Sequence, residues 1–71
     1  MNIKIINLDN DTHEIDYSID GVEAYMKADE LFEAEEKVHN YGEGKSETYT
    51  HYPDFSDYTE DYLKEFIKSK L

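Results

Sequence analysis

The feature that most constrains the fold is an alternation of apolar and polar residues on both sides of Asp20-Gly21. Over residues 13–28 nearly every second side chain is apolar or aromatic, which is typical of strands with one buried face. An Asp-Gly pair favours a two-residue type I′ turn, and such a turn would set Ile19 opposite Val22. That single register places the apolar side chains of both strands on one face and adds a Glu–Lys cross-strand pair. We therefore expect an antiparallel hairpin.

A long helix is a second interpretation of the same segment. Asp20 would cap a helix that opens at Gly21, Glu23 would complete a capping box, and the helix would continue to His39. We prefer the hairpin because one pairing register sorts the side chains of two strands at once.

The segments on either side of this hairpin predict one further strand and one helix. An isoleucine-rich run at residues 2–8 has apolar groups on both faces, as a central strand does. Asp29 can act as the N-cap of a helix that extends from Glu30 to about His39. Its acidic residues lie early and its basic residues late, which suits the helix dipole. The apolar stripe of this helix would consist of Leu31, Ala34 and Val38.

The last third of the chain predicts a strand and a second helix. Residues 46–52 are rich in Thr and Tyr and are followed by Pro53, which ends the strand. The final helix begins near Ser56 or Thr59. The expected fold is a single acidic α+β domain over residues 1–71, in which a small antiparallel sheet (β-β-β-α-β-α) has its helices packed on one face.

The charge of the chain is strongly negative and unevenly distributed. Eighteen acidic residues face seven basic ones, all lysine, which gives a net charge of −11. The stretch from Asp9 to Asp61 alone carries −14, because it contains 17 acidic residues and three lysines. A net negative charge repels nucleic acid and anionic lipid, so we expect no direct binding to DNA, RNA or a membrane. The longest apolar run, Ile5-Ile6, is too short to span a bilayer, and we expect a cytoplasmic protein.

No motif predicts catalysis, a cofactor or a metal site. The chain has no cysteine, and its three histidines lie on different predicted elements. Asp9 and Asp11 resemble the start of a calcium loop, but Glu14 stands at the sixth position, where the EF-hand needs glycine. No serine lies in a strained elbow, and no glycine-rich loop could hold a phosphate. We therefore expect a protein that is not an enzyme and that binds no cofactor.

Acidic side chains and tyrosines remain as candidates for a binding function. Carboxylates fixed on a sheet or helix can imitate the regular negative charge of a nucleic-acid backbone. Exposed tyrosines beside them can anchor Arg and Lys side chains of a partner. The candidate partner-binding residues are Glu14, Asp16, Glu23 and Tyr25 on the hairpin, Glu30, Glu33 and Glu36 on the first helix, and Tyr49, Tyr52, Asp54 and Asp57 farther along the chain.

In its size, acidity and AT-rich residue usage the chain resembles phage-encoded DNA mimics that block restriction, CRISPR or repair nucleases. The resemblance is one of type and covers no stretch of sequence. It implies an anti-CRISPR or anti-restriction type of inhibitor that binds the nucleic-acid site of a basic host protein, as a monomer or homodimer. Two other interpretations stay open: a small acidic structural or adaptor protein of a phage or mobile element, and an antitoxin-like partner of a basic toxin.

Overall fold

The predicted hairpin is confirmed, and its register is the expected one. In the computed structural model, which describes residues 1–71, β2 (Glu14–Ile19) and β3 (Val22–Lys27) are antiparallel. Six of the seven expected pairs lie in this ladder, and His13, expected opposite Ala28, precedes β2. Asp20 has a φ of 48° and Gly21 a φ of 87°. Positive φ at both central positions is the signature of a type I′ turn. The alternative of a continuous helix from Gly21 is therefore excluded.

The strand predicted at residues 2–8 is present as β1 (Ile3–Asp9), but its expected central position is wrong. The sheet order is β1-β2-β3, so β1 is an edge strand and β2 lies in the middle. A β-bulge between Ile5 and Asn7 explains the apolar groups on both faces. Because the bulge adds one residue, the alternation shifts and Ile6 is left 52% exposed.

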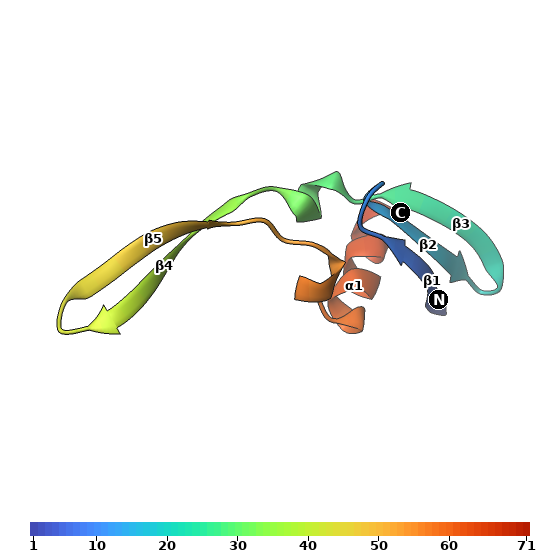
Figure 1. Ribbon diagram of the computed structural model, residues 1–71. Coiled ribbons are helices and arrows are strands. Elements are labelled where there is room, and N and C mark those ends of the chain that lie inside the picture. Colours follow the sequence, from blue (N-terminus) through green and yellow to red (C-terminus); the bar gives the residue numbers. More distant parts are fainter.

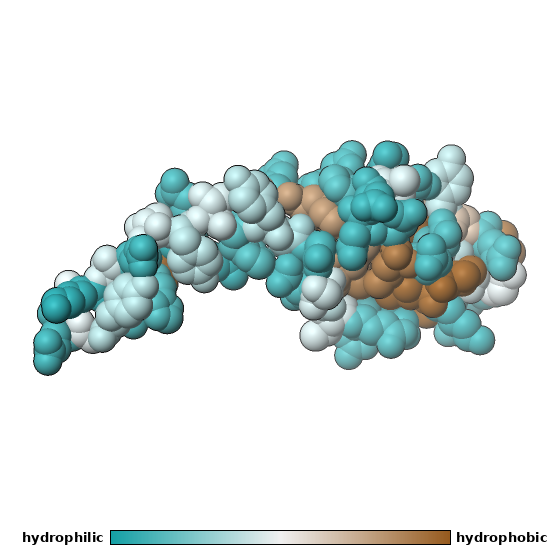
Figure 2. All heavy atoms as spheres, in the orientation of Figure 1, coloured by the Kyte–Doolittle hydropathy of each residue, from teal (hydrophilic) through white to brown (hydrophobic).

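One face of this sheet is covered by α1 (Glu60–Lys70), which confirms the predicted final helix (Figure 1). Thr59 is its N-cap, and the Thr59 hydroxyl accepts a hydrogen bond from the backbone N–H of Tyr62 at 3.1 Å. The core combines residues of the sheet, the helix and the connecting segments. Figure 2 shows the apolar side chains gathered in this part of the molecule. The buried apolar residues are Ile3, Ile15, Tyr17, Ala28, Leu31, Phe55, Leu63 and Ile67.

The helix predicted over residues 30–39 does not form. Asp29–Phe32 is a short 3₁₀ helix, η1, and Glu35–Gly42 is a strand, β4, which pairs with β5 (Lys45–His51). Most residues of β4 have weak helix propensity, and a glycine-rich turn brings a Thr- and Tyr-rich strand alongside. The expected fold with two helices on one sheet face is therefore wrong. The chain is mostly sheet, with 48% strand and 25% helix, and it contains five strands, one α-helix and two 3₁₀ turns.

The β4–β5 hairpin, residues 35–51, is called the arm below, and the rest of the chain is called the body. The arm extends away from the body, and the molecule measures 53 × 22 × 17 Å along its principal axes (Figure 1). The segments that enter and leave the arm are η1 and a second 3₁₀ helix, η2 (Phe55–Asp57). Phe32 and Phe55 join them through ring centroids 4.9 Å apart in an edge-to-face arrangement. This contact joins the two segments of the body at the base of the arm.

Candidate functional site

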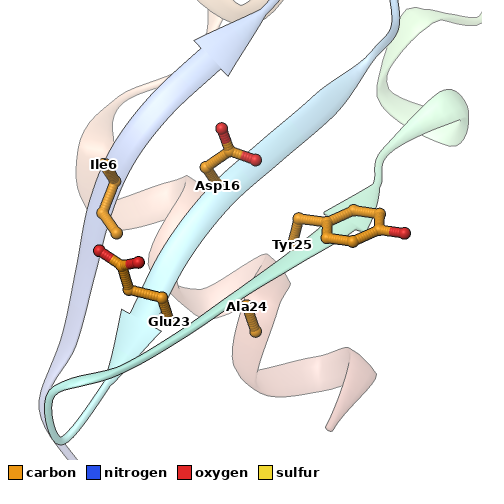
Figure 3. Close-up of a pocket in the computed structure, with 5 residues that line it drawn as sticks. All are labelled: Ile6, Asp16, Glu23, Ala24 and Tyr25. Carbon is orange, nitrogen blue, oxygen red and sulfur yellow. The ribbon is translucent and has the colours of Figure 1, made fainter.

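The hairpin places four of the predicted site residues on one surface. Asp16, Glu23 and Tyr25 lie on the sheet face opposite α1, which is called the outer face below (Figure 3). Glu14 shares this face because it is two residues from Asp16 on the same strand. Glu14 and Asp16 belong to β2, and Glu23 and Tyr25 belong to β3, with Asp16 directly opposite Tyr25. The alternation of the two strands therefore predicted correctly which side chains share this face.

A shallow pocket of about 310 Å³ lies on the outer face. In Figure 3, Ile6 on β1, Asp16 on β2 and Glu23 on β3 border the same hollow, and Tyr25 lies at its margin. Tyr25 is 67% exposed and Ile6 52% exposed. The pocket thus combines two carboxylates with the apolar side chain of Ile6, and the ring of Tyr25 extends from its margin. This combination fits the apolar stem and cationic head of a Lys or Arg side chain.

The carboxylates of Glu14, Asp16 and Glu23 form no ion pair with the chain's own cations. Lys27 stands opposite Glu14, as predicted, but its ammonium group donates a hydrogen bond of 3.1 Å to the backbone carbonyl of Thr12. The expected Glu–Lys pair is therefore present in register but is not a salt bridge. These three carboxylates therefore form no ion pair, although two lysines share their face: Lys27 lies opposite Glu14, and Lys4 pairs with Ser18, which lies opposite Glu23.

The second predicted cluster is separated by the structure. Glu30 lies in η1 and forms an ion pair with Lys70 at the end of α1. Glu33 follows η1, and Glu36 lies on β4 in the arm. The three residues do not share a helix face, because the helix expected to carry them is absent. Glu30 has a partner within the chain, whereas Glu33 and Glu36 form no ion pair.

The carboxylates of the third group stabilise the turn after the arm. Asp54 is the N-cap of η2 and accepts a hydrogen bond of 2.8 Å from the backbone N–H of Ser56. Hydrogen bonds from Ser56 lower the pKa of Asp54. Asp57 accepts a hydrogen bond of 2.9 Å from the backbone N–H of Asp54 and lies 3.3 Å from Nε2 of His51. Both carboxylates therefore have structural partners.

The two tyrosines of this group lie away from the outer face. Tyr49 is on β5, and Tyr52 directly follows that strand. Both rings are exposed to solvent, as the sequence predicted. They belong to the arm and its base, so the structure does not bring them together with Tyr25.

Two features of the structure were not predicted from the sequence. Ile6 lines the outer pocket because of the bulge in β1, and the adjacent pair Ile5-Ile6 was the only signal that one isoleucine points outward. The arm was missed because a helix was expected in place of β4. The glycines at positions 42 and 44 and the Thr- and Tyr-rich run after them were the available signal for a hairpin.

Comparisons with protein-family models, with curated proteins and with solved structures find no match to this chain. No three His, Cys, Asp or Glu side chains converge on a position that could hold a metal ion. No helix has both the length and the apolar character that crossing a membrane requires. A second pocket, of about 210 Å³, lies between the start of the chain and α1 and mixes lysines with a glutamate. The outer face therefore has the larger of the two pockets and three carboxylates that form no ion pair.

Proposed function

We propose that this protein is a non-enzymatic acidic inhibitor that occupies the nucleic-acid site of a basic protein in the host cytoplasm. The observation that carries the proposal is the group of three carboxylates on the outer face, Glu14, Asp16 and Glu23, which form no ion pair within the chain. Residues on one face of a strand repeat about every 6.8 Å, and neighbouring strands lie about 4.8 Å apart. The sheet therefore holds the charges at fixed spacings, and little side-chain and backbone freedom is lost when a partner binds.

The negative charge of the chain is concentrated in the part of the molecule that includes the outer face. Residues 1–34, which form the three-stranded sheet and η1, contain nine acidic residues and two lysines, for a net charge of −7. The arm carries −2, and residues 52–71 also carry −2. A concentrated field of this sign attracts the basic groove of a nucleic-acid-binding protein and speeds encounter by about 10- to 10³-fold at low ionic strength.

Occupying the partner's nucleic-acid site would be sufficient to inhibit it. Lys and Arg side chains that bind phosphates would instead contact the outer carboxylates, and one of them would enter the pocket beside Ile6. Nucleic acid is then excluded because the same cations cannot serve both. A nuclease or a CRISPR or restriction effector has a groove of this chemistry.

The test is retention of host proteins on the immobilised chain at low salt, followed by elution with a duplex DNA oligonucleotide. We expect basic proteins to be retained, and DNA to displace them. The triple variant Glu14→Lys, Asp16→Lys, Glu23→Lys should lose this retention. Reversal of Lys64 and Lys68 to Glu should have far less effect, because both lie on α1, behind the sheet.

A charge-matched control separates the outer face from net charge. Glu33, Glu36 and Glu43 form no ion pair, and their reversal to Lys changes the net charge by the same amount. This control should retain most of the binding. Equal losses in both triple variants, or retained proteins that DNA does not displace, would contradict the proposal.

The structural or adaptor role is the second candidate, and the projecting arm favours it. A protein held through the arm would stay bound when DNA is added and would be insensitive to reversal of the outer carboxylates. An antitoxin-like partner of a basic toxin would show the same charge dependence as the inhibitor, but DNA would displace it only if the toxin itself binds nucleic acid.

A further inference from the structure

The arm presents open backbone edges that the proposed inhibition does not use. β4 and β5 form a two-stranded sheet of their own, so each has one edge without a partner strand. Residues 35–50 of the arm are exposed, and no other element lies against either face of the arm (Figure 1). A two-stranded hairpin is only marginally stable in water, and an unpaired edge is a template for another strand. Pairing with a further strand would therefore stabilise the arm, and its unpaired edges allow such pairing.

The two edges of the arm differ in how well they are protected. β4 begins with three successive charged residues, Glu35, Glu36 and Lys37, and it carries a bulge between Asn40 and Gly42. Charges and bulges are the features by which sheet proteins prevent pairing at an edge. The β4 edge is therefore blocked.

The β5 edge is less protected, because its two charged residues, Lys45 and Glu47, are separated by Ser46, whereas β4 begins with three charged residues in succession. Its central residues Thr48, Tyr49 and Thr50 have high β-propensity, and no bulge falls within the strand. Its one acidic residue, Glu47, accepts a hydrogen bond from the hydroxyl of Tyr41 in the same arm. β5 is thus the edge that is open to pairing.

We propose that β5 pairs antiparallel with β5 of a second copy across a twofold axis at Thr48, so that the two arms form one four-stranded sheet. A twofold axis perpendicular to a sheet keeps each side chain on its own face, so the axis passes through a residue and its own copy. An axis at Glu47 would oppose two carboxylates. With the axis at Thr48 all seven residues of β5 are paired, and Glu47 faces Tyr49 of the second copy.

The distribution of charge favours this contact between two copies that each carry −11. The arm holds four glutamates and two lysines, for −2, and the body holds the remaining −9. Antiparallel pairing of β5 places the two bodies at opposite ends of the joined arms, about 23 Å apart for a seven-residue strand. This separation exceeds the Debye length of about 8 Å at physiological salt. The copies therefore meet where their mutual repulsion is weakest.

Sedimentation equilibrium measures this association. Between about 10 μM and about 1 mM protein, we expect the weight-average mass to rise from 8.4 kDa toward twice that value. Raising the salt should strengthen the association, because screening weakens the repulsion between the bodies. Binding to a basic partner should instead weaken with salt. The opposite salt dependences distinguish the two proposals, so failure of one would not imply failure of the other. A mass of 8.4 kDa at every concentration in both salts would overturn the inference.

Charge variants at the axis test the register. Thr48→Glu and Thr48→Lys should each lower the association constant about tenfold, because two like charges would face each other. An equimolar mixture of the two variants should restore it through a heterodimer, which a folding defect would not allow. Thr50→Glu is the matched control on the same strand, and it should have a smaller effect because it would face Ser46 of the second copy. A mixture that associates no better than either variant alone would overturn the pairing at Thr48.

Discussion

The hydroxyl of Tyr58 donates a hydrogen bond of 2.7 Å to the backbone carbonyl of Leu31, 27 positions earlier in the chain. Leu31 lies in η1 before the arm, and Tyr58 directly follows η2 after it. Together with the edge-to-face contact of Phe32 and Phe55, this bond closes the body at the base of the arm. The arm is therefore an insertion between two segments that hold each other.

Loss of this bond should weaken the body. Tyr58→Phe removes one hydroxyl and leaves the Leu31 carbonyl without its partner, so we expect the free energy of unfolding to fall by about 1 kcal/mol. Urea denaturation measures the change. Tyr52→Phe is the control, because Tyr52 is exposed and its hydroxyl makes no hydrogen bond. Equal stability of the two variants would contradict a role for the Tyr58 bond.

The same tyrosine predicts a loss of stability at high pH. Burial raises the pKa of Tyr58, and the charges of Glu35 and Asp57 raise it further from the ordinary value of 10.0. The folded chain then keeps the phenol proton at a pH where the unfolded chain has released it. The stabilisation is present below pH 10.0 and is lost as the pH rises through the raised pKa. Tyr58→Phe should lose less stability than the unmodified chain over this range, as measured by urea denaturation at several pH values.

The turn of the first hairpin should not accept a β-branched residue. Gly21 has a φ of 87°, and a Cβ built there has no atom within 4 Å, so a substitution strains the backbone without a steric clash from elsewhere. We expect Gly21→Val to lower the free energy of unfolding by more than about 1 kcal/mol. Gly21→Asn should cost less, because asparagine tolerates positive φ. A valine variant as stable as the asparagine variant would contradict this account of the turn.

The first hairpin was predictable because all of its signals are local and agree. The Asp20-Gly21 turn and the alternation on either side specify the same register, and a slip by one residue would turn every apolar side chain of a strand outward. The arm offered signals only at its turn, Gly42 and Gly44, and in its second strand. β4 is exposed on both faces, so it lacks the period-two hydrophobic pattern, while Leu31, Ala34 and Val38 happen to match helical spacing after a possible N-cap at Asp29.

The candidate site, like the fold, could be predicted from the sequence only in part. The outer-face residues Glu14, Asp16 and Glu23 follow from the alternation of the hairpin. The local roles of Asp54 and Asp57 do not, because a carboxylate that caps a 3₁₀ turn has the same residue type as one that faces a partner. Only the hydrogen-bond geometry distinguishes the two.

The body should fold without the arm. None of the eight core residues lies in residues 35–51, and Glu35 and His51 pair across adjacent strands, so a short Gly/Ser linker can replace the arm. We expect this variant to keep the circular dichroism of α1 and to differ from the full chain by less than about 1 kcal/mol. Phe55→Ala in the full chain is the contrasting change. It removes a buried ring and should cost about 3 kcal/mol. An unfolded linker variant would show that the arm stabilises the body.

Repulsion among the body's own carboxylates should limit its stability. Residues 1–34 carry −7, and the Debye length falls from about 30 Å at 0.01 M salt to about 8 Å at 0.15 M. We therefore expect Tm to rise between about 20 mM and about 500 mM sodium chloride at pH 7, in dilute protein where arms do not pair. Near pH 4.4, where the net charge approaches zero, the same salt should move Tm far less. This control separates screening from the general effect of salt on apolar burial. A Tm that does not change with salt at pH 7 would mean that the negative charges are too far apart, or too well solvated, to oppose folding.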